Sequence, residues 1–326
     1  MFTEPPIDWN TGTKSSLLNI GTHSLHLSTA GPTRLPAQPL LILIPGLASS
    51  TQGYSTLLTL LTPFIRVLTY QRTGYPPSET SPNSVPPTAS QAALELDLLL
   101  KKANLEPPYL IVVHSWGAII AREFLEIRGK GEIEGIVFVE GNSERILEKA
   151  DWRKVVGSKL LKGVDYFEGT EIVSTHKLGE RGWKTFREVE ENEEFKVQAR
   201  LEEKEYEGSF KVLRAKRQLE RDMPCLGGAP VCVVKGYNEG EFEKLLKKGL
   251  EMGNGDGEEE GEKEFRRMLD GWNEKDRDLQ SEVLKLSKRS KFIETRNSGH
   301  FVHLTEPEVI VGAIKWVLEE LNWREV

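Results

Sequence analysis

The sequence predicts an α/β protein with a mostly parallel central sheet and helices on both faces. Continuous apolar runs of about five residues, as at Leu40–Ile44 and Tyr109–Val113, are typical of strands buried on both faces. Segments with helical spacing of apolar residues alternate with such strands at both ends of the chain. Right-handed crossovers then place the strands parallel in one sheet.

The composition fits a globular protein of one large domain with an insertion. The chain has 326 residues, of which 38% are apolar, and its net charge of −7 gives no basic stripe for nucleic acid. Cys225 and Cys232 are too few for a disulfide scaffold or a cysteine-rich zinc site. Met1–Asn10 lacks the apolar core of a signal peptide, and Leu40–Ile44 is too short to span a bilayer. We therefore expect a soluble, cytoplasmic protein without a membrane partner.

The expected strands follow from apolar runs bounded by turn residues. Gly21-Thr22 predicts a hairpin between the first two strands, and Pro45-Gly46 ends the third. The expected strands are Ser16–Ile20, His23–Ser28, Leu40–Ile44, Ile65–Tyr70, Tyr109–Val113, Ile136–Val139, Pro230–Val234 and Lys291–Thr295.

Three helices of the core have recognisable ends. Thr88 and Gln91 form a capping-box pattern before a helix that runs to about Asn104. A second helix is expected over Gly117–Ile127, with Gly129 placed to terminate it. Thr305 and Glu308 repeat the capping-box pattern before the closing helix, with Pro307 in its first turn.

The pattern changes between the two halves of the core. We expect residues 1–141 and 224–326 to form the core and residues 142–223, rich in charged residues and scattered aromatics, to form a helical cap. The proline-rich segment Tyr75–Pro87 predicts a loop. Residues 251–264 hold seven acidic residues and one Lys, and we expect a flexible solvated loop there. That run carries most of the net charge, so the charge says little about a substrate.

Two short segments carry the candidate chemistry. Ser115 lies in Val113-His114-Ser115-Trp116-Gly117, between a buried strand and a helix, where the helix N-terminus can stabilise negative charge. His300 lies in a loop between the last strand and the closing helix, and so at the same sheet edge. A serine needs an adjacent base to act as a nucleophile, and His300 can supply it.

In these segments the chain resembles the α/β-hydrolase superfamily over nearly its full length. Leu43–Leu47 resembles that family's oxyanion strand and turn, and Tyr70–Tyr75 its Asp-Arg-x-Gly-Tyr segment. Val112–Gly117 resembles its nucleophile elbow, and Gly299–Leu304 its histidine loop. Phe138–Ser143 and the cap are most similar to fungal single-domain members, which suggests metabolite synthesis or detoxification.

The chain departs from that family's pattern at three positions. Val113 replaces the first glycine of Gly-x-Ser-x-Gly, Pro45 the His of a His-Gly pair, and Gln71 an Asp. None of these changes removes a group that performs chemistry, so we interpret them as tuning.

The resemblance implies a triad of Ser115, His300 and an acid, with the amides of Leu47 and Trp116 as the oxyanion hole. For the acid, Glu239 has the family's commonest position, three residues after Gly236. Glu140 has the position used in some relatives, and Glu241 is a further candidate. We favour Glu140, because a carboxylate that ends a buried strand is costly unless it is paired.

Other residues receive weaker expectations. Ser49, Ser50 and Tyr75 could line the pocket mouth, and the Trp116 side chain could form an apolar wall beside the nucleophile. The cap aromatics could contact substrate, although forming the cap's own core is the better interpretation. Further residues have a structural interpretation: His114, His303 and Arg72, the last as a holder of its loop, while His176 has no evident partner. His300 and His303 lack a third ligand, so no metal site is expected.

These observations predict a serine hydrolase that cleaves an ester or related acyl bond of a small, partly apolar substrate, without a cofactor. Alternatives on the same fold are an acyltransferase, a cofactor-free haloperoxidase, a carbon–carbon bond hydrolase or a non-catalytic ligand receptor. The family's dehalogenases and epoxide hydrolases use an Asp nucleophile, so Ser115 argues against both. The oligomeric state does not follow from the sequence.

Overall fold

A computed structural model describes residues 7–255 and 259–323. Met1–Pro6, part of the segment in which no signal peptide is expected, and residues 256–258 of the acidic run lie outside the described residues. Within these ranges the chain forms an eight-stranded sheet in the order β1-β2-β4-β3-β5-β6-β7-β8. The strands are β1 (Lys14–Asn19), β2 (Ser24–Ala30), β3 (Leu40–Ile44), β4 (Val67–Tyr70), β5 (Tyr109–His114), β6 (Ile133–Val139), β7 (Val231–Lys235) and β8 (Ser290–Glu294).

The sheet is parallel apart from its first two strands, as the sequence predicts. β1 and β2 form the expected hairpin, closed by a hydrogen bond from Ile20 N to His23 O of 2.9 Å. β2 also pairs antiparallel with β4, and every later pair is parallel. The carboxyl ends of β3, β5, β6 and β7 therefore meet at one edge.

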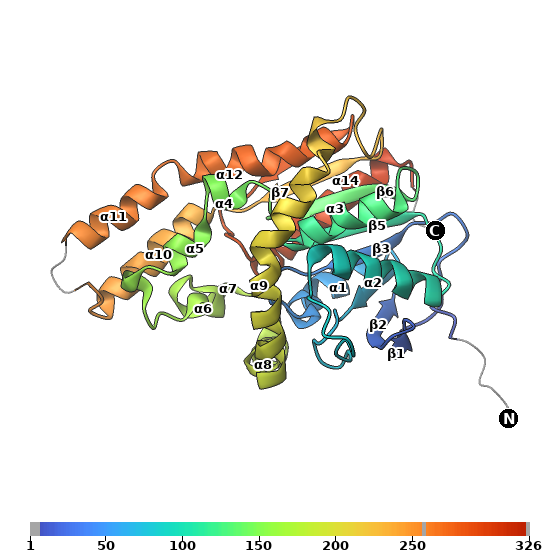
Figure 1. Cartoon of the computed structure of the whole chain (residues 1–326), viewed down its shortest axis with the longest axis horizontal. Helices are drawn as coiled ribbons and strands as arrows, with labels where there is room; N and C mark the ends of the chain where they lie inside the picture. Colours follow the sequence, from blue (N-terminus) through green and yellow to red (C-terminus); the bar gives the residue numbers. More distant parts are fainter. Residues whose placement is uncertain (1–6, 256–258, 324–326) are drawn as a thin grey trace.

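Helices cover both faces of the sheet (Figure 1). One face packs against α2 (Ala89–Lys102) and α3 (Gly117–Arg128), and the other against α1 (Ser55–Leu61) and α14 (Pro307–Glu320). Leu40, Ile42 and Ile44 belong to the first core, whereas Leu41 and Leu43 belong to the second. β3 is apolar throughout because alternate side chains of one strand enter two separate cores.

Two of the three predicted helix ends form as expected. The Thr88 side chain accepts a hydrogen bond from Gln91 N, and Gly129 ends α3 with a φ of 73°. The prediction for Thr305 is wrong. α14 begins at Pro307 with Glu306 at its N-cap, and Thr305 instead ends the short helix α13 (Val302–Thr305). Its hydroxyl forms a hydrogen bond with Ser298 Oγ, with the two oxygens 2.6 Å apart, instead of capping α14.

The segment after β6 is helical, as expected for a cap. Its longest helix, α9 (Glu193–Ala215), crosses the end of the sheet, with α8 (Gly179–Glu191) at one end of it (Figure 1). The shorter helices are α4 (Ile146–Lys149), α5 (Trp152–Val156), α6 (Tyr166–Gly169) and α7 (Ile172–Thr175). Short 3-10 helices occur at Thr51–Tyr54, Lys159–Leu161, Gln218–Glu220 and Glu282–Leu286.

A second helical excursion, between β7 and β8, was not expected. It comprises α10 (Asn238–Glu251), α11 (Glu259–Leu269) and α12 (Trp272–Ser281), which extend away from the sheet beside the short helices that follow β6 (Figure 1). α10 contacts α6, and α12 contacts α4. The expectation of a loop over residues 251–264 is therefore wrong from Glu259 onwards. The buried side chains of Phe265 and Leu269 lie one turn apart on α11, and this helical spacing of apolar residues within the acidic surface favours the helix.

Candidate active site

Ser115 lies on a sharp turn between β5 and α3. Its φ of 52° is a left-handed conformation that is rare for residues other than glycine. The turn is held by hydrogen bonds from Ser115 N to Val139 O and from Asn142 N to Ser115 O. Gly117 is required here, because a Cβ atom at this position would lie 2.6 Å from Ile44 O. Ser115 is thus presented at the N-terminus of α3.

His300 and Glu140 meet at the same edge. The imidazole Nδ1 lies 3.3 Å from Glu140 Oε2. An ionised carboxylate only accepts hydrogen bonds, so Nδ1 carries the proton and Nε2 is left as the basic nitrogen. Glu140 follows β6, is buried, and has a φ of 48°.

Three further donors hold the Glu140 carboxylate. Gly236 N and Gln280 Nε2 donate to Oε1 at 2.6 and 3.0 Å, and Asn238 Nδ2 donates to Oε2 at 2.5 Å. Burial alone raises the pKa of Glu140, but its hydrogen bond to His300 and the nearby charges outweigh burial and lower that pKa. Burial lowers the pKa of His300, and the contact with Glu140 reverses this so that the net pKa is raised.

The other two candidate acids do not reach the imidazole ring. Glu239 Oε2 accepts from Asn273 N at 3.1 Å. Glu241 Oε2 accepts from the backbone N of His300 at 2.9 Å and from the hydroxyl of Tyr166 at 2.7 Å. Glu241 therefore holds the histidine loop rather than the ring.

A buried ionic group that the sequence analysis missed lies behind Glu140. Lys235 Nζ, at the end of β7, lies 3.4 Å from Asp276 Oδ2 and donates to Asn273 Oδ1 at 2.7 Å. Burial and the charge of Glu140 raise the pKa of Asp276. The one signal in the sequence was a lysine that ends an apolar strand. Asp276 carried none, because it lies in an acidic helix that was not predicted.

Ser115 and His300 open into one cavity of about 420 Å³. Its walls come from both helical excursions. The first excursion, between β6 and β7, contributes Trp152, Tyr166 and Tyr206, and the second, between β7 and β8, contributes Phe242 and Trp272. No hydrogen bond joins Ser115 Oγ to His300 within the part of the chain that the structure describes. In ligand-free sites such bonds are often long and tighten when substrate binds. The remaining lining residues are Leu47, Ala48, Glu140, Gly141, Asn142, Ile146, Ala150, Val156, Phe167, Glu203, Asn238, Asp276, Gln280 and Phe301.

The candidate oxyanion amides belong to one residue that lines the cavity and one that follows Ser115. Leu47 lines the cavity, and Trp116 directly follows Ser115. Among the described residues, neither backbone N–H takes part in a hydrogen bond.

The Trp116 side chain is fully buried, and the Arg72 guanidinium lies 5.7 Å from the ring centre. The expectation that it forms a wall of the pocket is wrong.

The cavity does not include the other residues expected at its mouth. Tyr75 is buried and donates its hydroxyl to Glu202 Oε2 at 2.8 Å. Ser49 and Ser50 are also buried and are not among the lining residues. Gln71, at the usual Asp position, donates Nε2 to Thr51 Oγ1 at 3.1 Å, and so has a structural contact.

Three further histidines have structural surroundings. His114 Nε2 donates to the backbone O of His300 at 2.9 Å, and burial lowers the pKa of His114 to about 3. His303 stacks on Tyr54 with ring centres 4.1 Å apart, and His176 stacks on Trp183. No group of three potential metal ligands occurs in residues 7–255 and 259–323.

Comparison with known proteins assigns the chain to a family. The model of the alpha/beta hydrolase family matches residues 41–313. The chain belongs to the α/β-hydrolase family. An AB hydrolase superfamily protein of Gibberella zeae is 32% identical to this α/β-hydrolase over 308 residues, which cover 90% of this chain and 91% of the relative.

A probable transporter, efuK, of Hormonema carpetanum is 28% identical to this α/β-hydrolase over 317 residues. That match covers 96% of this chain and 44% of the relative. In the described residues, no helix has the length and apolar character needed to cross a membrane.

Solved structures share the fold at low sequence identity. A putative lipase of Acinetobacter baumannii superposes with a TM-score of 0.59 at 17% identity, covering 96% of this chain and 93% of that one. A putative epoxide hydrolase of Pseudomonas aeruginosa superposes with a TM-score of 0.62 at 13% identity, covering 98% and 100%. These likenesses establish the architecture of this α/β-hydrolase.

Proposed function

We propose that the chain is a serine hydrolase that cleaves an ester or related acyl bond through Ser115, His300 and Glu140. One observation carries the proposal: Ser115, on its strained turn, opens into the same cavity as His300, whose Nδ1 is held by Glu140. A serine that is activated by an oriented imidazole is the arrangement required for acyl transfer.

In the first half of the reaction, Ser115 Oγ attacks the carbonyl carbon and His300 Nε2 takes the hydroxyl proton. The amides of Leu47 and Trp116 stabilise the negative charge that develops on the carbonyl oxygen. His300 then gives its proton to the departing alkoxide, which leaves an acyl-enzyme. In the second half, His300 deprotonates a water molecule that attacks the acyl carbon. The bond from that carbon to Ser115 Oγ then breaks, His300 returns the proton to Ser115 Oγ, and the carboxylic acid leaves.

The cavity walls favour a neutral, partly apolar substrate. Aromatic and aliphatic side chains make up more than half of the lining residues, and the charged groups among those residues are the carboxylates Glu140, Glu203 and Asp276 and the imidazole of His300. A substrate carboxylate would meet these acids at short range, and the described residues that line the cavity include no lysine or arginine to compensate it. We therefore expect a neutral ester with an apolar or aromatic acyl group.

Substitution of the nucleophile tests the proposal. Wild type, Ser115→Ala and the control Ser174→Ala, at an exposed site in α7, are assayed on chromogenic esters of increasing acyl length. We expect Ser115→Ala to lose about 10³-fold or more of kcat and the control to match wild type. A fluorophosphonate probe should label Ser115 in folded wild type. Equal turnover in Ser115→Ala and wild type would refute serine catalysis, and failure to label would favour a non-catalytic receptor.

A further inference from the structure

The cap helix α9 contacts the turn that carries the candidate oxyanion amide. Glu202, in the middle of α9, is 1% exposed, and its Oε2 accepts a hydrogen bond from Ala48 N at 3.0 Å. Ala48 directly follows Leu47 and has a φ of 47°, an uncommon conformation for alanine. A side chain of the cap thus holds the Leu47–Ala48 peptide, which directly follows the peptide unit that carries the Leu47 N–H.

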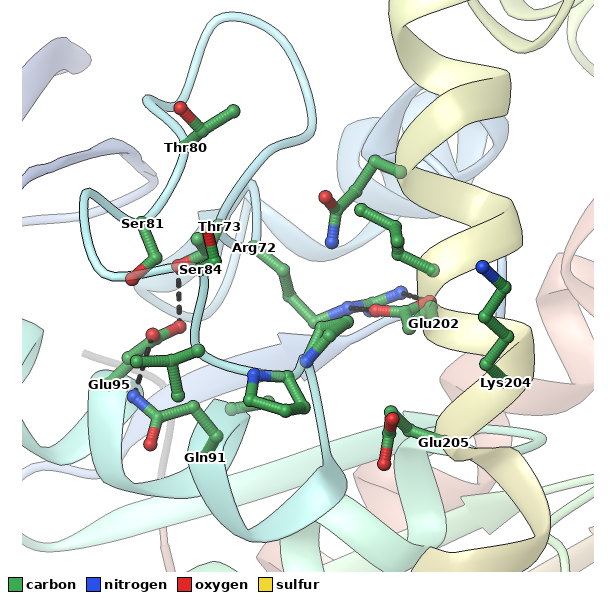
Figure 2. A pocket seen from close by; sticks show the side chains of 16 residues that line it. Arg72, Thr73, Thr80, Ser81, Ser84, Gln91, Glu95, Glu202, Lys204 and Glu205 are labelled. Atoms are coloured by element: carbon green, nitrogen blue, oxygen red, sulfur yellow. Dashed lines mark hydrogen bonds and ion pairs between the residues drawn. The ribbon is translucent and has the colours of Figure 1, made fainter.

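A single guanidinium group links this carboxylate to the rest of the turn. Arg72 donates Nε to Glu202 Oε1 at 2.6 Å and Nη2 to Oε2 at 2.9 Å (Figure 2). The same group donates Nη1 to Pro45 O at 3.2 Å and Nη2 to Gly46 O at 2.7 Å. Pro45, Gly46 and Ala48, the residues on both sides of Leu47, are therefore held by one buried ion pair.

Hydrogen bonds and opposite charge compensate the burial of Arg72 and Glu202. Glu202 Oε2 also accepts from the hydroxyl of Tyr75, so three residues donate to the carboxylate. Burial lowers the pKa of Arg72, and the charge of Glu202 more than reverses that effect. Hydrogen bonds to a charged carboxylate are shorter and stronger than those to a neutral acceptor, which suits a group that must fix a backbone position.

We propose that Glu202 is a positioning residue that fixes the oxyanion turn, so that the cap takes part in catalysis as well as covering the cavity. The inference rests on the proposed serine hydrolysis. Glu202 acts through Ala48 and Arg72 on the Leu47 amide, and it does not touch the substrate. The same helix supplies Glu203 and Tyr206 to the cavity wall, so substrate contact and oxyanion geometry share one rigid element.

The test compares Glu202→Gln with the control Glu205→Gln, which makes the same substitution one turn along α9 at a half-buried side chain. We expect Glu202→Gln to lower kcat at least tenfold and change KM less than threefold, because only the developing oxyanion uses the Leu47 amide. In a Ser115→Ala background, Glu202→Gln should leave the Kd of the ester unchanged. Glu205→Gln should match wild type in all three quantities.

Arg72→Lys keeps the charge but cannot bind the carboxylate and two carbonyls together, and it provides a second variant if Glu202→Gln fails to fold. It should show the same fall in kcat at a similar KM. Wild-type kcat in both variants, or a change of KM or Kd as large as that of kcat, would overturn the inference. A wild type that neither hydrolyses esters nor labels at Ser115 would instead refute the proposed function, and the inference with it.

Discussion

At the residue scale, the proposed nucleophile and the proposed acid share an unusual backbone conformation. Ser115 and Glu140 follow the adjacent parallel strands β5 and β6, and their φ values are 52° and 48°. Such conformations cost on the order of 1–3 kcal/mol and persist where the surroundings fix them. Here the backbone hydrogen bonds Ser115 N to Val139 O and Glu140 N to Val234 O tie each turn to the next strand. The strain directs both side chains out of the sheet edge.

Substitution of the candidate acids separates Glu140 from Glu239. Glu140→Gln should lower kcat by about 10³- to 10⁴-fold, because a neutral amide no longer fixes the imidazole tautomer or stabilises its protonated form. Glu239→Gln should remain near wild type, since its carboxylate contacts a backbone amide away from the imidazole. The measurement is steady-state kinetics on one ester. Near-normal turnover in Glu140→Gln would exclude Glu140 as the triad acid.

The pH profile of wild type and Glu140→Gln adds a second measurement. The net pKa of His300 is raised above its ordinary 6.5, and the imidazole must be neutral to act as base. In wild type, kcat/KM should therefore fall as the pH drops through a value above 6.5. In Glu140→Gln the raising contact is lost, so this limb should move to lower pH. An unmoved limb would show that another group sets it.

At the scale of elements, close backbone contact places the histidine loop. A Cβ atom at Gly236, just after β7, would lie 2.1 Å from Gly299 O, and Gly236 N donates to Glu140 Oε1. Glu241 of α10 packs on Gly299 from another side and binds His300 N. The loop thus lies between the end of β7 and the first turn of α10. The contact with β7 requires glycine at position 236, and the contact with α10 requires glycine at position 299.

Two glycine substitutions should have opposite effects on stability. Gly236→Ala should lower the free energy of unfolding by about 1–3 kcal/mol and reduce kcat, because the new methyl group displaces the His300 loop. Gly208→Ala, inside α9 with open space around it, should raise stability by about 0.5–1 kcal/mol without affecting kcat. Chemical denaturation and the esterase assay measure both quantities. Unchanged turnover in a folded Gly236→Ala would contradict the proposed positioning of the loop.

At the scale of the whole molecule, the cavity forms where two excursions from the sheet meet. The first, after β6, supplies α4 to α9, and the second, after β7, supplies α10 to α12 (Figure 1). Phe242 of α10 packs edge-on against Trp272 of α12, with ring centres 5.0 Å apart, and both line the cavity. Substrate selectivity should therefore depend on both excursions.

Shortening a side chain of the second excursion tests this dependence. Phe242→Ala should enlarge the cavity and shift the preferred ester to a longer acyl chain, while fluorophosphonate labelling of Ser115 persists. The control is Leu250→Ala, at an exposed position of the same helix, which should keep the wild-type preference. The acyl-length series measures the shift. An unchanged optimum in folded Phe242→Ala would remove α10 from the substrate site.

Features that depend only on neighbouring residues could be predicted from the sequence. The buried strands, the helix caps at Thr88 and Gly129, and the turns around Ser115 and His300 depend on neighbours within a few positions. Alternating strands and helices then determined the fold class, because parallel strands bring their carboxyl ends to one edge. The sequence by itself therefore determined the sheet, its family and the two residues most central to the proposed chemistry.

The tertiary structure alone decided which distant groups meet. Glu140, Glu239 and Glu241 differ in role only because the fold places the first against the imidazole ring, the second on Asn273 N, and the third on the backbone of His300. The ion pair of Arg72 with Glu202, 130 residues apart in the chain, and the helices of the acidic segment likewise depend on packing. Local propensity does not encode such contacts, since each gains its stability from burial against a partner remote in sequence.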